Sequence, residues 1–402
     1  MIGMKGKNKL LTALLCAALL LCGCASTAPE QGAPEQNTAD AAPTESTPAQ
    51  TGAPALPGLV YERTMEKRYA QQFDVYYYEG GYKYLAIGDG NNYLVVPEGK
   101  TAPEGLEAGV KILRQPLDRI YLAGSSCMAL FDAMDSLDII ALTSLKRDDW
   151  YVENAAAAMD RGEILFGGKY SEPDYELLVD SEISLAIENT MILHTPKIIE
   201  MIENLGIPVF IENSSYEPHP LGRTEWIKLF AALINREEAA EAYFDQNVAV
   251  MDKIEAFPNT GKTVAIFLID SAGRAQVRSA EDYLSKIITI AGGQNAFGQL
   301  QNSEESRRTN VSMTMEEFYA TAMDVDYLIY NASGYSAGVN SVDKLLEMSP
   351  LLADCKAVRE GNIWWIGPET YQHSDKIASL IADIHTMLTA GEGEMTFLHK
   401  ME

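Results

Sequence analysis

The sequence predicts a mixed α/β fold in which two blocks of parallel sheet are joined by one long helix. Short apolar strands alternate with amphipathic helices over residues 119–212, and the same alternation returns over residues 263–388. Such alternation is typical of parallel sheets that are covered by helices on both faces. Between the two blocks, residues 224–257 keep apolar side chains at helical spacing.

The first block contains four predicted strands and four predicted helices. The strands are expected at 119–123, 139–144, 183–188 and 207–212, and the helices at 127–137, 151–159, 173–179 and 196–205. Upstream, the run "FDVYYYEGGYKYLAIGDGNNYLVVP" at 73–97 alternates apolar residues with Gly-rich and Asn-rich turns. This pattern predicts a three-stranded antiparallel meander.

The second block follows the long helix, in which Asn235 is the expected site of any bend and which Pro258 and Asn259 end. Its strands are expected at 263–270, 326–330 and 363–367, and its helices at 280–291, 315–323, 342–347 and 374–388. The folded chain therefore divides into four predicted parts: an N-terminal lobe at 59–223, an inter-lobe helix at 224–257, a C-terminal lobe at 258–390 and a tail at 391–402.

The first 23 residues have the layout of a signal peptide for export. Three lysines precede an apolar stretch of about a dozen residues, which is too short for a membrane-spanning helix. The stretch ends in Leu21-Cys22-Gly23-Cys24, which resembles the bacterial lipobox. By this resemblance Cys24 carries a lipid and becomes the mature N-terminus. The alternative is an ordinary export signal with two incidental cysteines.

A linker is predicted at residues 24–58, which are rich in Ala, Pro and Thr and contain no aromatic side chain. Such a segment cannot bury enough apolar surface to offset the entropy lost on ordering, so we expect it to be disordered. A semi-extended chain of this length reaches roughly 100 Å.

Charge and cysteine content narrow the class of protein. Without the three signal lysines, 28 basic residues face 57 acidic ones, which gives a net charge of −29. This acidity makes a nucleic-acid partner improbable on electrostatic grounds. After Cys24 only Cys127 and Cys355 remain, far apart in the sequence. Two buried free thiols are the favoured interpretation, and a disulfide between them is the alternative.

Six stretches, in this order, resemble a known family. They are "EPDYELLVDSEISLAIE", "IIEMIENLGIPVFIE", "NREEAAEAYFDQ", "LSKIITIAGGQNAF", "VSMTMEEFYATAMDVDYLIY" and "KAVREGNIWWIG". Together they are similar to the substrate-binding lipoproteins that serve ABC importers for ferric siderophores, haem and cobalamin. The resemblance covers residues 117–388.

The resemblance implies a binding protein without enzymatic activity and without a cofactor of its own. It implies two lobes bridged by a rigid helix, a ligand cleft between the lobes, and an iron or cobalt chelate as the transported ligand. The protein would be a monomer on the outer face of the cell membrane, held by its lipid and docking on a permease. Family members present one Glu per lobe to the permease, and the matching positions are Glu176 and Glu317. Glu316 is adjacent to Glu317, so the register is open.

Ligand contacts are expected on the loops that follow the carboxyl ends of the strands. Aromatic and basic side chains on these loops would suit bulky or anionic ferric chelates. The candidates are Ser126, Met128, Lys146, Arg147, Trp150, Tyr216, Arg274, Arg307, Arg308, Tyr335, Tyr371 and His373, with Ser125, Asn189, Ser214 and Asn331 on the same loops.

Haem would require an axial ligand from each lobe, and Met128 with His373 is the predicted pair. Core packing is the favoured interpretation of Met128, because its helix also carries Phe131 on an apolar face.

Two competing classes of protein are weaker. The run "GYSAG" fits the G-x-S-x-G of hydrolases, with Ser336 as nucleophile and His373 or His385 as base, although the expected strand–turn–helix context is poor. A site for a bare metal ion requires clustered His and carboxylate ligands, whereas the five histidines are scattered. No protein-ligated metal is therefore expected.

Overall fold

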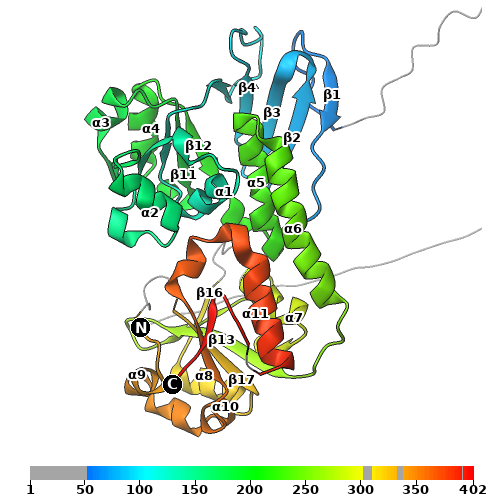
Figure 1. The fold of residues 1–402 in the computed structure, drawn as a ribbon, viewed down its shortest axis with the longest axis vertical. Helices are drawn as coiled ribbons and strands as arrows, with labels where there is room; N and C mark the ends of the chain where they lie inside the picture. Colours follow the sequence, from blue (N-terminus) through cyan, green and yellow to red (C-terminus); the bar gives the residue numbers. More distant parts are fainter. Residues whose placement is uncertain (1–51, 302–309, 333–337, 392) are drawn as a thin grey trace, which may run out of the picture. The chain divides into compact units, whose positions relative to one another are not determined.

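Three large sheets, one two-stranded ribbon and two central helices organise the described part of the chain (Figure 1). The computed structural model describes residues 52–301, 310–332, 338–391 and 393–402. Among these residues, no helix is both long enough and apolar enough to cross a membrane.

The first lobe is built on a five-stranded parallel sheet of order β12-β11-β6-β7-β8, which confirms the predicted alternation. Its strands are β6 (Ile120–Leu122), β7 (Ile140–Thr143), β8 (Leu165–Phe166), β11 (Leu185–Asn189) and β12 (Val209–Glu212). The helices are α1 (Met128–Ala133), α2 (Glu153–Asp160), α3 (Tyr175–Asp180) and α4 (Pro196–Asn204), with a short ribbon of β9 (Gly168–Lys169) and β10 (Glu172–Pro173). Because all five strands of the sheet are parallel, their carboxyl ends lie at one edge, where the lobe can present a site.

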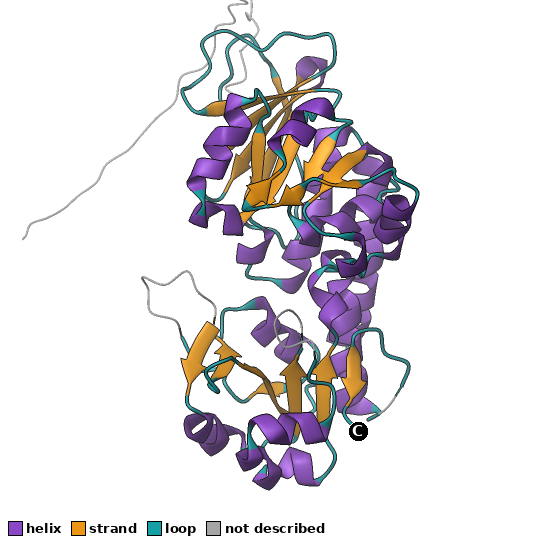
Figure 2. Cartoon of the chain, turned by 90° about the vertical axis from the view of Figure 1, so that its left-hand side faces the viewer, coloured by secondary structure: helices purple, strands orange, loops and turns teal. Residues whose placement is uncertain are grey.

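The second lobe has a mixed sheet of order β16-β14-β13-β17-β18-β19, with β15 also paired to β13. Its strands are β13 (Thr263–Ile269), β14 (Ala275–Arg278), β15 (Gln294–Asn295), β16 (Asn310–Met313), β17 (Tyr327–Asn331), β18 (Ile363–Ile366) and β19 (Leu398–Lys400). The helices are α7 (Tyr283–Ile290), α8 (Met315–Ala322), α9 (Val342–Met348), α10 (Lys356–Arg359) and α11 (Ile377–Thr389). Helices lie against the strands in both lobes (Figure 2).

The expected parallel strands β13, β17 and β18 form the centre of this second sheet. The prediction of a separate tail at 391–402 was wrong, because β19 pairs antiparallel with β18. The buried carboxylate of Asp383 in α11 holds this segment by accepting the backbone N–H groups of Thr396, Phe397 and Leu398 at 2.9, 2.6 and 3.1 Å. Asp383 contacts residues beyond the end of its own helix, so this contact leaves no helical or strand periodicity in the sequence.

The predicted inter-lobe helix is two helices, α5 (Pro220–Ile234) and α6 (Glu237–Glu255). The prediction of one long helix was wrong, and the break falls at Asn235, the expected site of a bend, because this residue adopts a left-handed conformation with φ 58° and ψ 47°. Asn tolerates this conformation better than most residues. The buried ammonium group of Lys83 stabilises the break by donating to the carbonyl of Ala232, to Asn235 Oδ1 and to Glu237 Oε1 at 2.7, 2.7 and 2.5 Å.

Lys83 comes from a third sheet, which contains the predicted antiparallel meander. This sheet has the order β1-β2-β3-β4-β5. Its strands are β1 (Tyr61–Thr64), β2 (Phe73–Tyr78), β3 (Tyr82–Ile87), β4 (Asn92–Val96) and β5 (Val110–Arg114). The hydroxyl of Tyr93 accepts the N–H of Ile211 on edge strand β12 at 3.2 Å. The meander therefore covers the edge strand of the first lobe's sheet and satisfies one of its donors.

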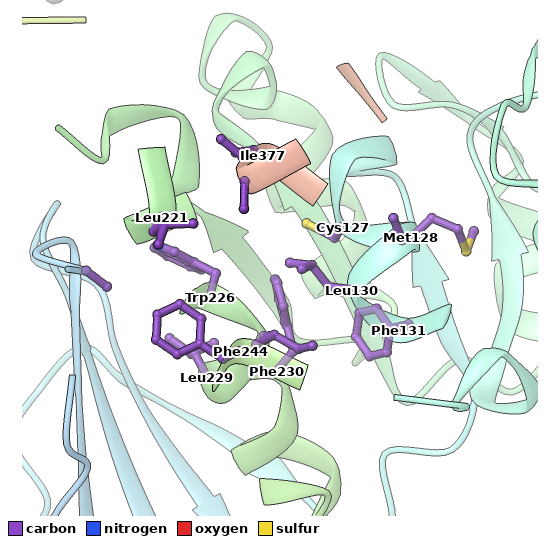
Figure 3. Packing of buried hydrophobic residues seen from close by; sticks show 14 of the residues in the cluster. Cys127, Met128, Leu130, Phe131, Leu221, Trp226, Leu229, Phe230, Phe244 and Ile377 are labelled. Atoms are coloured by element: carbon purple, nitrogen blue, oxygen red, sulfur yellow. The ribbon is translucent and has the colours of Figure 1, made fainter. Parts of the chain in front are cut away.

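Helix α5 lies at the centre of the main hydrophobic core. Trp226 and Phe230 of α5 are fully buried and lie close to Phe244 of α6 and Phe131 of α1 (Figure 3). Cys127 and Cys355 are both buried and free, which confirms the favoured interpretation of the two thiols.

Two buried carboxylates attach the segment between β1 and β2 to α5. Glu225 accepts the consecutive N–H groups of Arg68, Tyr69 and Ala70 at 2.7, 2.7 and 2.8 Å. Glu217 accepts those of Gln71 and Gln72 at 2.8 and 2.9 Å, together with the indole N–H of Trp226. The two carboxylates thus accept five successive backbone N–H groups. These hydrogen bonds offset part of the free-energy cost of burying the two carboxylates.

Replacing Glu225 by Gln is expected to lower the free energy of unfolding by about 2–4 kcal/mol, because an amide offers one acceptor oxygen and sets its own NH₂ group against the backbone donors. Urea denaturation followed by circular dichroism measures the change. The control is Glu241→Gln, whose side chain is 50% exposed and whose loss is expected to stay below about 1 kcal/mol. Equal losses in the two variants would contradict this account of the segment.

His219 caps the first turn of α5 and must be neutral to do so. Its Nδ1 accepts the N–H of Leu221 at 3.2 Å, and its ring stacks on Tyr69 with 4.3 Å between centroids. Burial, assisted by the charge of Lys286 and opposed by that of Glu225, lowers the pKa of His219 from 6.5 to about 4. A protonated Nδ1 could no longer accept this hydrogen bond.

The stability advantage of the wild type over His219→Asn is expected to fall by about 2 kcal/mol between pH 7 and pH 5. Unfolded histidine takes up a proton near pH 6.5 and the folded residue only near pH 4. The contribution is therefore complete above the upper value and is lost as the pH falls towards the lower one. Asn preserves a capping acceptor but does not titrate. Urea denaturation of both proteins at both pH values is the measurement, and a pH-independent difference would contradict the assignment.

Candidate functional site

The two lobes meet where residues 149–151 of the first lobe contact residues 371–375 after β18. Gln372 is fully buried at this contact. Its Nε2 donates to the carbonyl of Asp149 at 2.8 Å and to the hydroxyl of Tyr371 at 2.8 Å, and its Oε1 accepts the N–H of Tyr151 at 2.8 Å. One side chain therefore fixes a loop from each lobe.

Ser374 continues this contact toward the central helices. Its hydroxyl donates to the carbonyl of Ser126 at 2.6 Å, and its carbonyl accepts from Thr224 Oγ1 of α5 at 2.7 Å. The next residue, Asp375, accepts from the hydroxyl of Tyr243 in α6 at 2.8 Å. The segment is thus held by a first-lobe loop and by both helices.

Two tyrosines, one from each lobe, lie exposed beside the Gln372 contact. The rings of Tyr151 and Tyr371 meet edge to face at 6.4 Å, and the residues are 42% and 39% exposed. Trp150, next to them, is buried, and within the described residues its indole N–H has no hydrogen-bond partner. Tyr371 and Trp150 were predicted, whereas Tyr151 was missed, although its position beside Trp150 was a usable signal.

Arg223 is the charged side chain at the junction of the lobes that sequence reasoning missed. It lies in the first turns of α5, and its guanidinium carbon stands 4.3 Å from the ring centroid of Tyr283 at the start of α7. Within the described residues its Nε has no hydrogen-bond acceptor. A helix interior is not where strand-end reasoning looks for ligand contacts, which is why Arg223 went unnoticed.

Buried carboxyl groups lie at the carboxyl ends of the neighbouring strands β11 and β12. Glu212 accepts the N–H of Ser214 at 2.8 Å, and burial raises its pKa despite that bond and the nearby charge of Arg223. Burial also raises the pKa of Glu188, which is fully buried and has no hydrogen-bond partner in the described part of the chain. Both side chains therefore favour the protonated form more than an exposed Glu does.

Met128 does not line a site: it is fully buried in the main hydrophobic core (Figure 3). The prediction of Met128 as a cleft residue was wrong, and core packing was the right interpretation, because its helix turns the apolar face that carries Phe131 into the core. His373 remains partly accessible, with its Nδ1 3.2 Å from Asp375 Oδ1. The predicted Met–His pair therefore loses one member.

Several of the predicted basic residues are already engaged. Arg147 is bound by both oxygens of Asp160 at 2.9 Å, and this pairing lowers the pKa of that carboxyl. Arg274 donates to Ser312, and the ammonium of Lys146 lies over the ring of Phe166. These side chains are exposed rather than gathered at the Gln372 contact.

The remaining candidates have mixed outcomes. Ser126 takes part in the Gln372 contact through its backbone carbonyl, and Ser125 is the residue before it. Tyr216 and Asn189 are partly exposed. Ser214 and Asn331 are buried. Cys24, Arg307, Arg308, Tyr335 and Ser336 lie outside the described residues.

The two glutamates expected to dock on a permease differ in their surroundings. Glu176 is exposed at the second position of α3, after the cap Asp174. Glu317 is at the third position of α8 and closes a capping box, accepting the N–H of Thr314 at 2.8 Å, and this bond lowers its pKa. Glu316 is at the second position of α8, so it is the residue that matches Glu176 in helix register.

Other pockets and side-chain clusters in the described residues give weaker support for a functional site. Two pockets of about 410 and 320 Å³ flank the break between α5 and α6, and neither is lined by the residues of the Gln372 contact. Among the described residues, no three His, Cys, Asp or Glu side chains are grouped so that they could hold a metal ion.

Comparison with known proteins bears on the fold and the family. A family model described as "Periplasmic binding protein" matches residues 134–370. Two uncharacterized lipoproteins of Methanocaldococcus jannaschii are each 25% identical, over 351 and 365 residues. These alignments cover 83% and 82% of this chain, and 86% and 83% of the two relatives.

Solved structures share the fold at low sequence identity. The periplasmic haem-binding protein HutB of Vibrio cholerae is 19% identical with a TM-score of 0.54, and the match covers 67% of this chain and 98% of that one. The periplasmic catecholate-siderophore binding protein VctP of Vibrio cholerae is 15% identical with a TM-score of 0.53, covering 68% and 94%.

Proposed function

The chain belongs to the periplasmic binding protein family, and we propose that it captures a metal chelate outside the cell membrane and delivers it to an ABC importer. The family and the structural relatives are solute-binding proteins and not enzymes. The hydrolase alternative is therefore not retained.

The observation that carries the proposal is the contact between residues 149–151 and residues 371–375. It joins strand-end loops of both lobes at the edge where open α/β sheets bind ligands. Tyr151 and Tyr371 expose aromatic surface there, one from each lobe. Aromatic rings supply contact area at low entropic cost, which suits a bulky chelate.

Within this class we propose a ferric siderophore as the first choice of cargo, with haem and cobalamin as alternatives. Burial of Met128 removes the predicted axial pair, so haem would need ligation of another kind. His373 keeps partial exposure and would be one contact for such a ligand.

Anchoring and docking belong to the same proposal. Cys24 would carry the lipid, and residues 24–58 would form the linker to the first strand. Glu176 and either Glu316 or Glu317 would dock on the permease. The register of α8 supports Glu316, since the carboxylate of Glu317 is already bonded to its own cap.

Purified protein is expected to bind a ferric catecholate, a ferric hydroxamate, haem or cobalamin with micromolar or tighter affinity, seen as quenching of tryptophan fluorescence. Tyr151→Ala and Tyr371→Ala should each weaken this binding about tenfold, because each removes one aromatic contact. Tyr319→Ala, a half-buried tyrosine of α8 outside this contact, is the matched control. Saturable binding of none of the four chelates would reject the proposed function.

Uptake is expected to depend on Glu176 and Glu316 without any change in ligand affinity. In cells that rely on this protein, Glu176→Gln and Glu316→Gln should each lower uptake of radioactive iron chelate several-fold, because each removes a carboxylate that meets a basic pocket. Glu317→Gln should retain uptake, since Gln also closes a capping box. Loss of uptake confined to Glu317→Gln would instead return the docking role to Glu317.

A further inference from the structure

Arg223 carries an inference that rests on the proposed function and deepens it. Its guanidinium lies where α5 meets the second lobe, 4.3 Å from the ring of Tyr283. We propose that Arg223 recognises an anionic oxygen group of the cargo, such as a carboxylate or a catecholate, so that the protein selects anionic chelates.

The first argument is that the donors of Arg223 are not used elsewhere in the described chain. Its Nε is buried without an acceptor, and no described carboxylate forms an ion pair with it. By contrast, Arg147 and Arg161 each bind a carboxylate through two nitrogens, at 2.7–2.9 Å. A buried guanidinium nitrogen without a partner is costly, so a ligand that supplies acceptors would be strongly favoured.

The second argument is that nearby charge is arranged so that these donors remain available. Glu212 is close enough to interact electrostatically with Arg223, yet its carboxyl accepts from Ser214 and Ser126 instead. The Glu212 carboxyl therefore leaves the guanidinium donors of Arg223 free for another acceptor. The cation–π contact with Tyr283 holds the guanidinium in place, and an Arg side chain can form two parallel hydrogen bonds to a planar anion.

The third argument is position. Arg223 belongs to α5, Tyr283 begins the second lobe's helix α7, and Ser126 follows strand β6 of the first lobe. The neighbouring residue Thr224 donates to Ser374 of the segment that contacts the first lobe. An anion held by Arg223 would thus lie beside elements of both lobes, as a cargo bound between lobes requires.

The competing interpretation is that Arg223 only balances the buried Glu212. In that case its replacement would disturb folding and would affect cargoes of every charge alike. In the proposed role, loss of binding depends on the charge of the cargo.

The experiment titrates full-length mature protein with four probes by tryptophan fluorescence: ferric tris-catecholate, ferric citrate, the cationic hydroxamate ferrioxamine B, and haemin. Arg223→Gln should weaken binding of the anionic catecholate or citrate complex tenfold or more, which is the usual size of a lost charge-assisted hydrogen bond. Arg223→Lys should weaken binding less than Arg223→Gln does, because Lys keeps the positive charge but lacks the paired donors of a guanidinium. Any binding of ferrioxamine B should change less than threefold. Arg161→Gln, whose guanidinium is exposed and paired with Glu163, is the matched control.

Thermal unfolding of each variant separates folding from recognition. If Arg223→Gln is unstable, Tyr283→Leu supplies a second test, because it removes the cation–π contact that holds the guanidinium and should weaken binding of the anionic probes only. Equal loss for all bound probes, no loss for any, or wild-type binding of ferrioxamine B alone would overturn the inference while leaving the proposed function intact. Absence of binding to every probe, and to cobalamin as well, would reject both.

Discussion

The burial of α5 is the constraint on which the rest of the described structure depends. Thirteen of its fifteen residues are buried, so a helix that links two lobes is also the interior of the protein. Such a helix cannot satisfy its polar side chains with water. Thr224, Glu225 and Lys228 are instead bonded to Ser374, to residues 68–70 and to Glu66, respectively.

The same constraint explains the role of the meander sheet. Its segment at 68–72 supplies the backbone donors for Glu217 and Glu225, and its Lys83 supplies the cation at the end of α5. A cation at a helix C-terminus is favourably placed with respect to the helix dipole. The meander therefore forms hydrogen bonds to α5 and to α6, on both sides of the break at Asn235, and stabilises the arrangement of the two helices. The family match begins at residue 134, so the meander sheet lies outside the part of the chain that the family model describes.

The site depends on the same helix. The segment at 371–375 is held to α5 through Thr224 and to α6 through Tyr243, so the loops that carry Tyr151 and Tyr371 are placed by buried bonds. The chain has a net charge of −26, and among the described residues Arg147 is paired with Asp160 and Arg274 is bonded to Ser312. In the proposed role, Arg223, which forms no ion pair within the described residues, would attract an anion on a protein whose overall charge disfavours anions.

By itself, the sequence determined what depends on neighbours along the chain: the alternating strands and helices of both lobes, the meander and the helical spacing of α5 and α6. These follow from periodicity and turn residues, which act within a few residues. Only the tertiary structure decided what depends on distant partners. Lys83 stabilises the break at Asn235. Residues at the C-terminal end form strand β19 because they pair with β18. Tyr283 contacts Arg223 at the junction of the lobes. The tertiary structure also placed Met128 in the core. The sequence shows which face of a helix is apolar, but not which residues of other elements pack against that face.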